Sequence, residues 1–344
     1  MSCPGLDFQL SCFHTAPEAR GPSRLRFNVH DAPVPSSNFH PRGLVLYSRR
    51  VRFRKVTIVG VGLLGGSLGL ALQKRRLADR VIGYVRRKAS VSEARRHRAV
   101  HEATRDLRRA VAEADLVILC TPLAQMRSLA AEMAVALKPG AVVTDVGSVK
   151  ASVVRDLEKR VARAGAHFIG SHPMAGSEKT GVAAARADLF VNAICVVTPT
   201  KSSDRAALRR VEQFWKSVGG RVKRLSPRVH DLLVSRSSHL PHLLAAALTN
   251  LVLDPGGPAA LADLCATGFR DTTRVASGSP EMWRDIALAN RHNLVGALDA
   301  FARDLVRLRR ALASDDPKWL GRWLEQARDR REKWRSRMVS PTPE

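Results

Sequence analysis

His172 lies in a segment whose residue types suit a base beside a binding site. The segment reads Gly170-Ser-His-Pro-Met-Ala-Gly-Ser-Glu-Lys-Thr-Gly181, so a proline follows the histidine directly and restricts the backbone there. Gly176 and Gly181 permit a ligand to approach the main chain closely. An imidazole titrates near neutral pH, and we therefore predict that His172 is a general base. A histidine with a purely structural role is the alternative.

Three other segments group polar side chains with glycine or proline in a similar way. They are Asp145-Val-Gly-Ser-Val-Lys150, Ser238-His-Leu-Pro-His242, and Gly268-Phe-Arg-Asp-Thr-Thr-Arg274, which is followed by Met282-Trp283. The first of them, and the segment that holds His172, both follow predicted strands. Because open α/β sheets bind their ligands at the carboxyl ends of the strands, we expect both segments to be loops at one active site.

A glycine-rich turn supplies the site for a second reactant. In Lys55-Val-Thr-Ile-Val-Gly-Val-Gly-Leu-Leu-Gly-Gly-Ser67, a β-branched run leads into G-x-G-x-x-G, and a helix-forming run follows. Gly60 permits the tight turn, Gly62 has no Cβ to block a pyrophosphate, and Gly65 lets the helix pack closely on the strand. The free N–H groups at the start of the helix attract the anion. A dinucleotide is the predicted ligand, and a turn without a ligand is the alternative.

The end of the second predicted strand indicates which dinucleotide binds. A site for NAD places an acidic residue about 20 residues beyond the glycines, on the ribose hydroxyls. Here Val85 holds that position, and Arg86 and Arg87 follow. Because a guanidinium binds a 2′-phosphate well, we predict NADP rather than NAD, with an exposed basic turn as the alternative. The predicted cofactor site comprises Gly60, Gly62, Leu63, Leu64, Gly65, Arg86, Arg87, Thr121 and Pro122.

Alternating strands and helices must position these residues, and that pattern is typical of a parallel sheet with helices on both faces. Strands are predicted over 55–60, 80–85, 114–122, 141–145, 167–170, 193–198 and 221–225. Helices are predicted between them over 64–76, 90–98, 123–137, 149–164 and 204–218. After Ser226 only helices are predicted, over 227–253, 258–267, 280–312 and 315–336.

The fold class is therefore α/β, with an N-terminal Rossmann-type doubly wound parallel sheet and an all-helical C-terminal domain for dimerisation and substrate binding. We place a disordered or irregular extension at 1–50, the dinucleotide-binding domain at 51–226, the helical domain at 227–337 and a tail at 338–344. All-helical appendages usually bury their apolar faces against a second copy of the chain. This arrangement predicts a homodimer.

Charge and cysteine content limit the possible functions. The 344 residues carry a net charge of +26, but the basic residues are spread along helices and aromatic residues make up only 5%, which disfavours nucleic-acid binding. The charge favours an anionic small molecule. Five scattered cysteines without CxxC spacing indicate a reducing, cytoplasmic location and no metal site.

Targeting and membrane signals are weak in this sequence. No apolar run of about 18 residues is present, which disfavours a membrane span. Residues 1–50 are rich in Pro, Ser, Arg and His and lack the charged and apolar regions of a secretory signal. An organellar transit peptide stays open as an alternative to a disordered tail.

Taken in order, GxGLLGGS, DVGSVK, SHPMAGSEKTG, SHLPH and GFRDTTR…MW resemble the prephenate/arogenate dehydrogenase family of tyrosine biosynthesis, from about Lys55 to Arg310. The resemblance implies oxidative decarboxylation, in which hydride leaves ring C4 of a cyclohexadienol for the nicotinamide and loss of the ring carboxylate gives a phenol. The implied substrate is prephenate, which gives 4-hydroxyphenylpyruvate, or arogenate, which gives tyrosine, or both in a cyclohexadienyl dehydrogenase. Val85 departs from the family pattern, which often has an acid after strand two.

The resemblance also implies a role for each candidate residue. His172 would take the proton of the C4 hydroxyl, and Ser148 would orient the imidazole and touch the substrate or the nicotinamide. Arg274 would pair with a substrate carboxylate, for which its planar guanidinium is suited. His242 would line the pocket, and Glu178 would set the polarity at its mouth. The structural alternatives include a helix cap for Ser148 and an internal ion pair for Arg274.

Two other functional classes share the glycine-rich turn. A β-hydroxyacid dehydrogenase or imine reductase would have no need of SHPMAGSEKTG or SHLPH. A non-catalytic NADP-binding regulator would have no need of Ser148, His172 and Arg274 together, and all three are present. We therefore favour the dehydrogenase, with prephenate as the expected substrate. Residues 338–344 are too few for a further ligand-binding domain, so we expect no tyrosine control through one.

Overall fold

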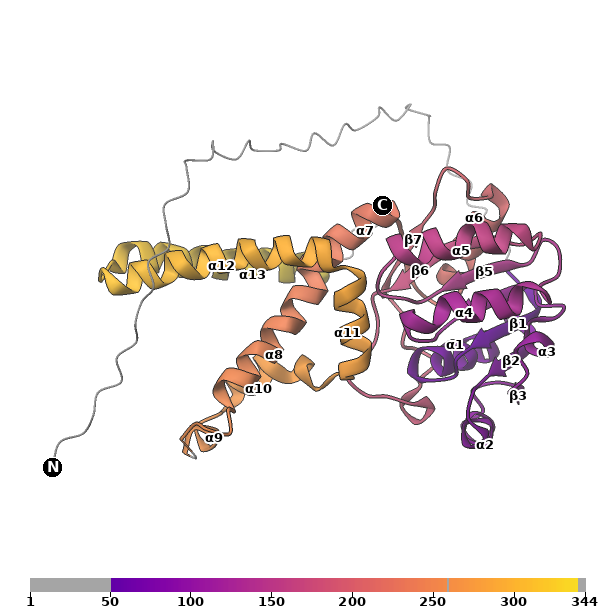
Figure 1. Ribbon diagram of the computed structural model, residues 1–344, viewed down its shortest axis with the longest axis horizontal. Coiled ribbons are helices and arrows are strands. Elements are labelled where there is room, and N and C mark those ends of the chain that lie inside the picture. Colours follow the sequence, from indigo (N-terminus) through magenta and orange to yellow (C-terminus); the bar gives the residue numbers. More distant parts are fainter. Residues whose placement is uncertain (1–50, 259, 340–344) are drawn as a thin grey trace, which may run out of the picture. The chain divides into compact units, whose positions relative to one another are not determined.

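The computed structural model describes residues 51–258 and 260–339 (Figure 1). The extension predicted at 1–50 and most of the predicted tail lie outside the described residues. Within them, eight strands form one sheet in the order β3-β2-β1-β4-β5-β6-β7-β8. The strands are β1 (Phe53–Val59), β2 (Ala78–Tyr84), β3 (Glu102–Thr104), β4 (Leu116–Leu119), β5 (Val142–Asp145), β6 (His167–Pro173), β7 (Ile194–Thr198) and β8 (Arg221–Arg224).

The strand order creates the edge at which the site is built. The chain runs from β1 outward through β2 to β3, then returns to the other side of β1 and continues from β4 to β8. All neighbouring strands pair in parallel except β6 and β7, which are antiparallel. The carboxyl ends of β1, β4, β5 and β6 therefore lie next to one another, and the order reverses between β1 and β4, where such sheets bind ligands.

Helices cover both faces of the sheet, as predicted for a doubly wound fold (Figure 1). One core contains buried residues of α1 (Leu63–Lys74), α2 (Lys88–Arg96) and α6 (Arg205–Ser217). The other contains buried residues of α3 (Leu107–Val111), α4 (Leu123–Ala134) and α5 (Ala151–Arg163). In β4, Leu116 and Ile118 join the first core while Val117 and Leu119 join the second, because successive side chains of a strand point to opposite faces.

The chain after Ser226 is helical throughout its described part, as predicted. The elements are α7 (Pro227–Val234), a π-helical turn (Ser235–His239), α8 (Leu240–Val252), α9 (Ala260–Asp263), α10 (Thr267–Thr273), a 3₁₀ turn (Arg274–Ser277), α11 (Pro280–Ala289), α12 (Arg291–Ala313) and α13 (Pro317–Val339). The two long helices α12 and α13 pack along one another (Figure 1). A search of the described residues finds no helix with the length and hydropathy needed to cross a membrane.

The prediction that His172 lies in a loop was wrong. Strand β6 continues through Pro173, because His172 and Pro173 lie opposite Val196 and Cys195 in the antiparallel pair with β7. Glycine and proline disfavour a strand when the sequence is read locally, and the predicted strand therefore ended at Gly170. The pairing with β7 outweighs that local preference and gives the histidine a rigid backbone.

Two short elements of secondary structure and several helix interruptions were also not predicted. Strand β3 and helix α3 were not predicted, because Glu102-Ala-Thr104 is only three residues long and has no apolar run. The helices predicted over 227–253 and 280–312 are each interrupted, the first by the π-helical turn and the second at Asn290. The helix predicted over 258–267 is reduced to the four residues of α9. Asn290 is the C-cap residue of α11, and its buried side chain donates a hydrogen bond to the main chain of α7.

Candidate active site

Strands β5 and β6 bring two candidate residues to one edge of the sheet. The two strands are parallel neighbours, and the segment from Asp145 to Lys150 leaves the end of β5. His172 is the penultimate residue of β6 and keeps only 8% of its surface exposed, while Ser148 is half-buried. The predicted base and the predicted loop therefore meet where the fold places a ligand.

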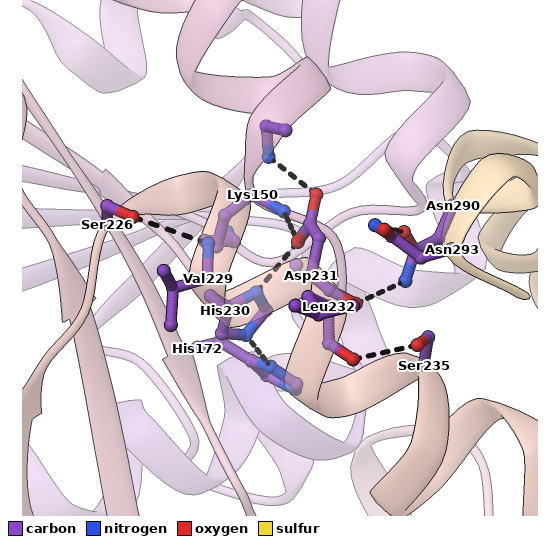
Figure 2. A network of polar contacts seen from close by, with 12 residues as sticks. Lys150, His172, Ser226, Val229, His230, Asp231, Leu232, Ser235, Asn290 and Asn293 are labelled. Carbon is purple, nitrogen blue, oxygen red and sulfur yellow. Dashed lines mark hydrogen bonds and ion pairs between the residues drawn. The ribbon is translucent and has the colours of Figure 1, made fainter. Parts of the chain in front are cut away.

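A chain of hydrogen bonds orients the imidazole of His172 (Figure 2). Its Nδ1 lies 2.9 Å from Nε2 of His230, and Nδ1 of His230 lies 2.8 Å from Oδ1 of Asp231. The carboxylate of Asp231 also accepts hydrogen bonds from the backbone N–H groups of Lys150 and Ala151, at 2.7 and 2.8 Å. His230 therefore makes an orienting contact to His172, and the orienting role predicted for Ser148 stays a prediction.

Sequence analysis missed His230 and Asp231. Both lie near the start of α7, which Ser226 caps by accepting a hydrogen bond from the N–H of Val229. The two residues are adjacent in the sequence, so a histidine followed by an aspartate on a predicted helix was the available signal. That signal is weak, because nothing in the spacing indicates that the helix packs against β6.

The surroundings of His172 favour its neutral form. Burial is the largest cause, and the neighbouring His230, Lys150 and His239 add to it, so that the pKa of His172 lies well below its ordinary value of 6.5. A neutral imidazole can accept a proton, whereas an imidazolium cannot. The environment therefore keeps the imidazole of His172 neutral at neutral pH, as the predicted general base requires.

This lowered pKa sets an expected pH dependence. A general base loses its function when it is protonated, and the lowered pKa of His172 moves that protonation to lower pH. We expect the acid limb of kcat/KM to lie below pH 6.5, measured with saturating dinucleotide in buffers of constant ionic strength. The groups that face His172 are His230, Lys150 and His239. An acid limb at or above pH 6.5 would contradict this view of the site.

A buried ion pair fixes the loop between β5 and α5. Lys150 and Asp145 have fully buried side chains, and Nζ of Lys150 pairs with Oδ2 of Asp145. Nζ also donates to the carbonyl oxygen of Ser171 at 2.9 Å, while the N–H of Ser171 donates to Oδ1 of Asp145 at 3.1 Å. The N–H of Gly147 donates to Oδ2 of the same carboxylate at 2.8 Å. The loop that carries Ser148 is thus tied to the residue preceding His172.

Two further histidines and a tryptophan form a cluster on the helical side. The ring of His242 stacks on Trp283 with centroids 3.5 Å apart, and His239 meets the same tryptophan edge-on at 6.2 Å. Burial lowers the pKa of His239 to about 4 and also lowers the pKa of His242. Nε2 of His239 and Nδ1 of His242 are buried without a hydrogen-bond partner in the described part of the chain. Such unpaired polar atoms suit a polar ligand.

Arg274 and Glu178, both predicted to bind substrate, lie next to each other. Nη1 of Arg274 is 3.0 Å from Oε2 of Glu178, although the two residues are 96 positions apart. The arginine side chain is 60% exposed and the glutamate side chain 34%, so this pair is at the surface, where ion pairs contribute little to stability. The guanidinium accordingly remains accessible to an incoming carboxylate.

The glycine-rich turn after β1 fits a dinucleotide. Gly60 has φ of +101°, which favours glycine, and a Cβ on Gly65 would lie 2.0 Å from the carbonyl oxygen of Gly60. A Cβ on Gly62 would meet no atom of the described residues within 4 Å, so these residues leave open space above Gly62. Helix α1 begins at Leu63, and no acidic residue lies in its first turn. At the neighbouring end of β4, Oγ1 of Thr121 is buried without a partner among the described residues.

The basic residues after β2 are accessible, as a phosphate contact requires. Val85 is buried, whereas Arg86 and Arg87 are exposed. Nε of Arg105, in the loop after β3, donates to the carbonyl oxygen of Arg86 at 3.0 Å. Sequence analysis missed Arg105 because it missed β3. Arg86, Arg87 and Arg105 therefore lie close together in the chain segments that follow β2 and β3.

Comparison with known proteins identifies the family. A cyclohexadienyl dehydrogenase from Zymomonas mobilis is 36% identical over 78% of this chain and 92% of its own length. Residues 68–224 match the nucleotide-binding domain of prephenate dehydrogenase, and residues 226–326 match its dimerization domain. The chain belongs to the prephenate dehydrogenase family. The resemblance inferred from the five motifs is confirmed.

Solved structures of family members are similar over most of this chain. The structure of prephenate dehydrogenase from Aquifex aeolicus in complex with hydroxyphenyl propionate and NAD⁺ has a TM-score of 0.78 and 33% identity, and covers 83% of this chain and 99% of its own. Arogenate dehydrogenase from Synechocystis has a TM-score of 0.68 and 32% identity, and covers 81% of this chain and 99% of its own. As a member of the prephenate dehydrogenase family, this chain is an oxidoreductase with a nucleotide-binding domain.

Proposed function

We propose that this chain is a prephenate dehydrogenase that catalyses the NAD(P)-dependent oxidative decarboxylation of prephenate to 4-hydroxyphenylpyruvate. The hydrogen-bond chain from Asp231 through His230 to His172 carries the proposal, because it holds a neutral base at the sheet edge that also bears the glycine-rich turn. The family assignment supports it, as does the Aquifex aeolicus relative with bound NAD⁺ and hydroxyphenyl propionate.

Each proposed role follows from the chemistry of one residue. His172 accepts the proton of the C4 hydroxyl as hydride leaves C4. The bound dinucleotide supplies the hydride acceptor. The electron pair of the breaking bond between the ring and its carboxylate enters the ring, CO₂ leaves and the ring becomes aromatic. Arg274 pairs with a substrate carboxylate, and His242 contributes a polar atom to the pocket wall.

Arogenate is the second candidate substrate, and the arogenate dehydrogenase from Synechocystis, at 32% identity, favours it. The cyclohexadienyl dehydrogenase from Zymomonas mobilis raises the further option that both substrates are accepted. The deciding experiment is a spectrophotometric assay of the purified full-length chain with prephenate and with arogenate, each with NAD and with NADP. The proposal requires a higher kcat/KM for prephenate than for arogenate. Turnover of neither compound would refute the proposed function.

Replacing Arg274 with alanine should raise the KM for the substrate about 10-fold or more, because a charge-assisted contact to a carboxylate is worth ~1.5–3 kcal/mol. Arg335→Ala is the matched control, since Arg335 is a similarly exposed arginine that is ion-paired with Glu332 in α13. Steady-state kinetics at saturating dinucleotide give both values. If KM for the Arg274 variant stays within about twofold of that of the control, Arg274 only forms its ion pair with Glu178.

We propose that NADP is preferred over NAD, with Arg86 as the main contact to the 2′-phosphate. Val85 provides no carboxylate to bind the ribose hydroxyls, and Arg86, Arg87 and Arg105 supply positive charge nearby. The Aquifex aeolicus relative was solved with NAD⁺, so the preference rests on the residues of this chain. Open space above Gly62 is compatible with either dinucleotide.

The ratio of kcat/KM for NADP to that for NAD measures this preference. We expect Arg86→Ala to lower the ratio about 10-fold or more, because one contact between a guanidinium and a phosphate is lost. Arg96→Ala, at an exposed position of α2, is the control and should leave the ratio unchanged. Adding Val85→Asp to Arg86→Ala should reverse the preference. A wild-type preference for NAD would contradict the proposal, and a preference unaffected by Arg86→Ala would contradict the role of that residue.

We also propose that the helical domain forms a homodimer. Residues 226–326 match the dimerization domain of the family. Large apolar side chains are exposed on these helices, including Leu251, Leu288, Val295 and Leu312. Exposed apolar surface of this extent is rare on monomeric proteins and is typical of surfaces that another chain covers.

A further inference from the structure

We propose that His230 and Asp231 are positioning residues that fix the tautomer of His172. Asp231 keeps the proton of His230 on Nδ1, so Nε2 of His230 accepts a hydrogen bond from the N–H at Nδ1 of His172. Nε2 of His172 is thereby left unprotonated and free to act as the base. This inference deepens the proposed function, on which it rests for the role of His172 as the base.

The first step of the argument concerns the carboxylate of Asp231. It is 2% exposed and receives three N–H groups, from the main chain of Lys150 and Ala151 and from the ring of His230. The two backbone groups can only donate, so both carboxylate oxygens act as acceptors. The carboxylate also lies at the N-terminus of α5, where the partial positive charge of the helix favours an anion. Asp231 thus accepts a hydrogen bond from the N–H at Nδ1 of His230.

The second step concerns the two rings. A neutral imidazole has one donor nitrogen and one acceptor nitrogen. Because Nδ1 of the fully buried His230 donates to Asp231, its Nε2 is the acceptor. That Nε2 faces Nδ1 of His172 at 2.9 Å, with the ring planes inclined by 72°. Two nitrogens at hydrogen-bond distance cannot both act as acceptors, so Nδ1 of His172 carries the proton.

The third step concerns the contacts that hold α7, the helix that carries His230 and Asp231. The side chain of Asn290 donates to the carbonyl oxygen of Asp231 at 2.8 Å (Figure 2). It also lies 3.1 Å from Nδ1 of His239. Asn293, one turn along α12, donates to Oδ1 of Asn290 at 2.8 Å. The start of α7 is therefore held by α12 on one side and by α5 on the other. The ring of His230, which is fully buried, is held between Asp231 and His172 by its two hydrogen bonds.

The test measures the tautomer directly in the resting protein. The full-length chain is labelled with ¹⁵N-histidine, and long-range ¹H–¹⁵N correlation spectra distinguish Nδ1–H from Nε2–H. Comparison with His172→Asn assigns the signals of residue 172. We expect His172 to carry its proton on Nδ1 in the wild-type protein. A proton on Nε2 would overturn the proposal, whatever the activity of the chain.

Two variants at one position separate positioning from folding. His230→Gln places an amide near the position of Nε2 and can still accept from His172, whereas His230→Asn reaches only the position of Nδ1 and can bind Asp231 alone. We expect the Gln variant to retain the Nδ1–H tautomer of His172 and a kcat within about 10-fold of wild type. The Asn variant should lose the tautomer, and its kcat should fall by about 100-fold or more. KM for the dinucleotide should be unchanged in both.

The outcomes distinguish this inference from the proposed function. Equal tautomers and equal kcat values in the Gln and Asn variants would overturn the positioning role. The spectra are recorded without substrate or dinucleotide, so the tautomer is established even if neither prephenate nor arogenate is turned over. A fixed Nδ1–H tautomer in a chain without that activity would refute the proposed function and leave the positioning of His172 intact.

Discussion

Replacing His172 with asparagine should lower kcat by about 10²–10⁴-fold, the usual effect of losing a general base. The asparagine side chain fills part of the space of the imidazole and can still reach Nε2 of His230. The fold and the hydrogen bond between His230 and Asp231 should therefore be preserved. It has no basic nitrogen at the far side of the ring. We therefore expect KM for the dinucleotide and the melting temperature to change little.

The matched control is His292→Asn, because His292 is an exposed histidine on α12. It should have the kcat of the wild-type chain. Both variants are measured at saturating dinucleotide, and a binding titration with the dinucleotide alone confirms that the cofactor site is intact. A His172 variant that keeps more than about a tenth of wild-type kcat would remove His172 from the proton transfer.

Replacing Lys150 with methionine should lower the free energy of unfolding by about 3–5 kcal/mol, because one partner of a buried ion pair is removed and the other stays buried. The carboxylate of Asp145 would keep its hydrogen bonds from the N–H groups of Gly147 and Ser171 but lose its counter-ion. The carbonyl oxygen of Ser171 would lose a donor as well. Urea denaturation measures the free energy of unfolding, and because urea is uncharged it does not screen the ion pair.

Arg307→Met is the control for this variant, because Arg307 pairs with Asp304 on the exposed surface of α12. Exposed ion pairs contribute ~0–1 kcal/mol, so the control should be close to wild type. A loss of less than about 1 kcal/mol in Lys150→Met would show that Asp145 does not need its buried partner.

The sequence predicted those features that depend on local pattern. The glycine-rich turn between β1 and α1 is encoded within thirteen residues, and the strand and helix around it follow from apolar periodicity. The all-helical character after Ser226 was also predictable, because strand patterns stop there. His172 is predictable as a candidate base from the residues next to it in the sequence, without knowledge of its partners.

Features that depend on tertiary pairing were not predictable in the same way. Local glycine and proline disfavour a strand at His172, and only the pairing with β7 extends β6 that far. The contact between His230 and His172 joins residues 58 positions apart, and no periodicity indicates it. Lys150 was noticed as part of a motif, but its burial against Asp145 follows from the packing of β5 and β6.

The cap of α5 has a consequence for the order of folding. This helix begins after Lys150 without a side-chain cap of its own, and its first N–H groups are satisfied by Asp231, 80 residues later in the chain. Closing so long a loop costs entropy and slows folding, so this contact should form late. Until it forms, the first turn of α5 lacks its acceptors and His172 lacks its partner. We therefore expect His172 to gain its orienting partner only after α7 has packed against the start of α5.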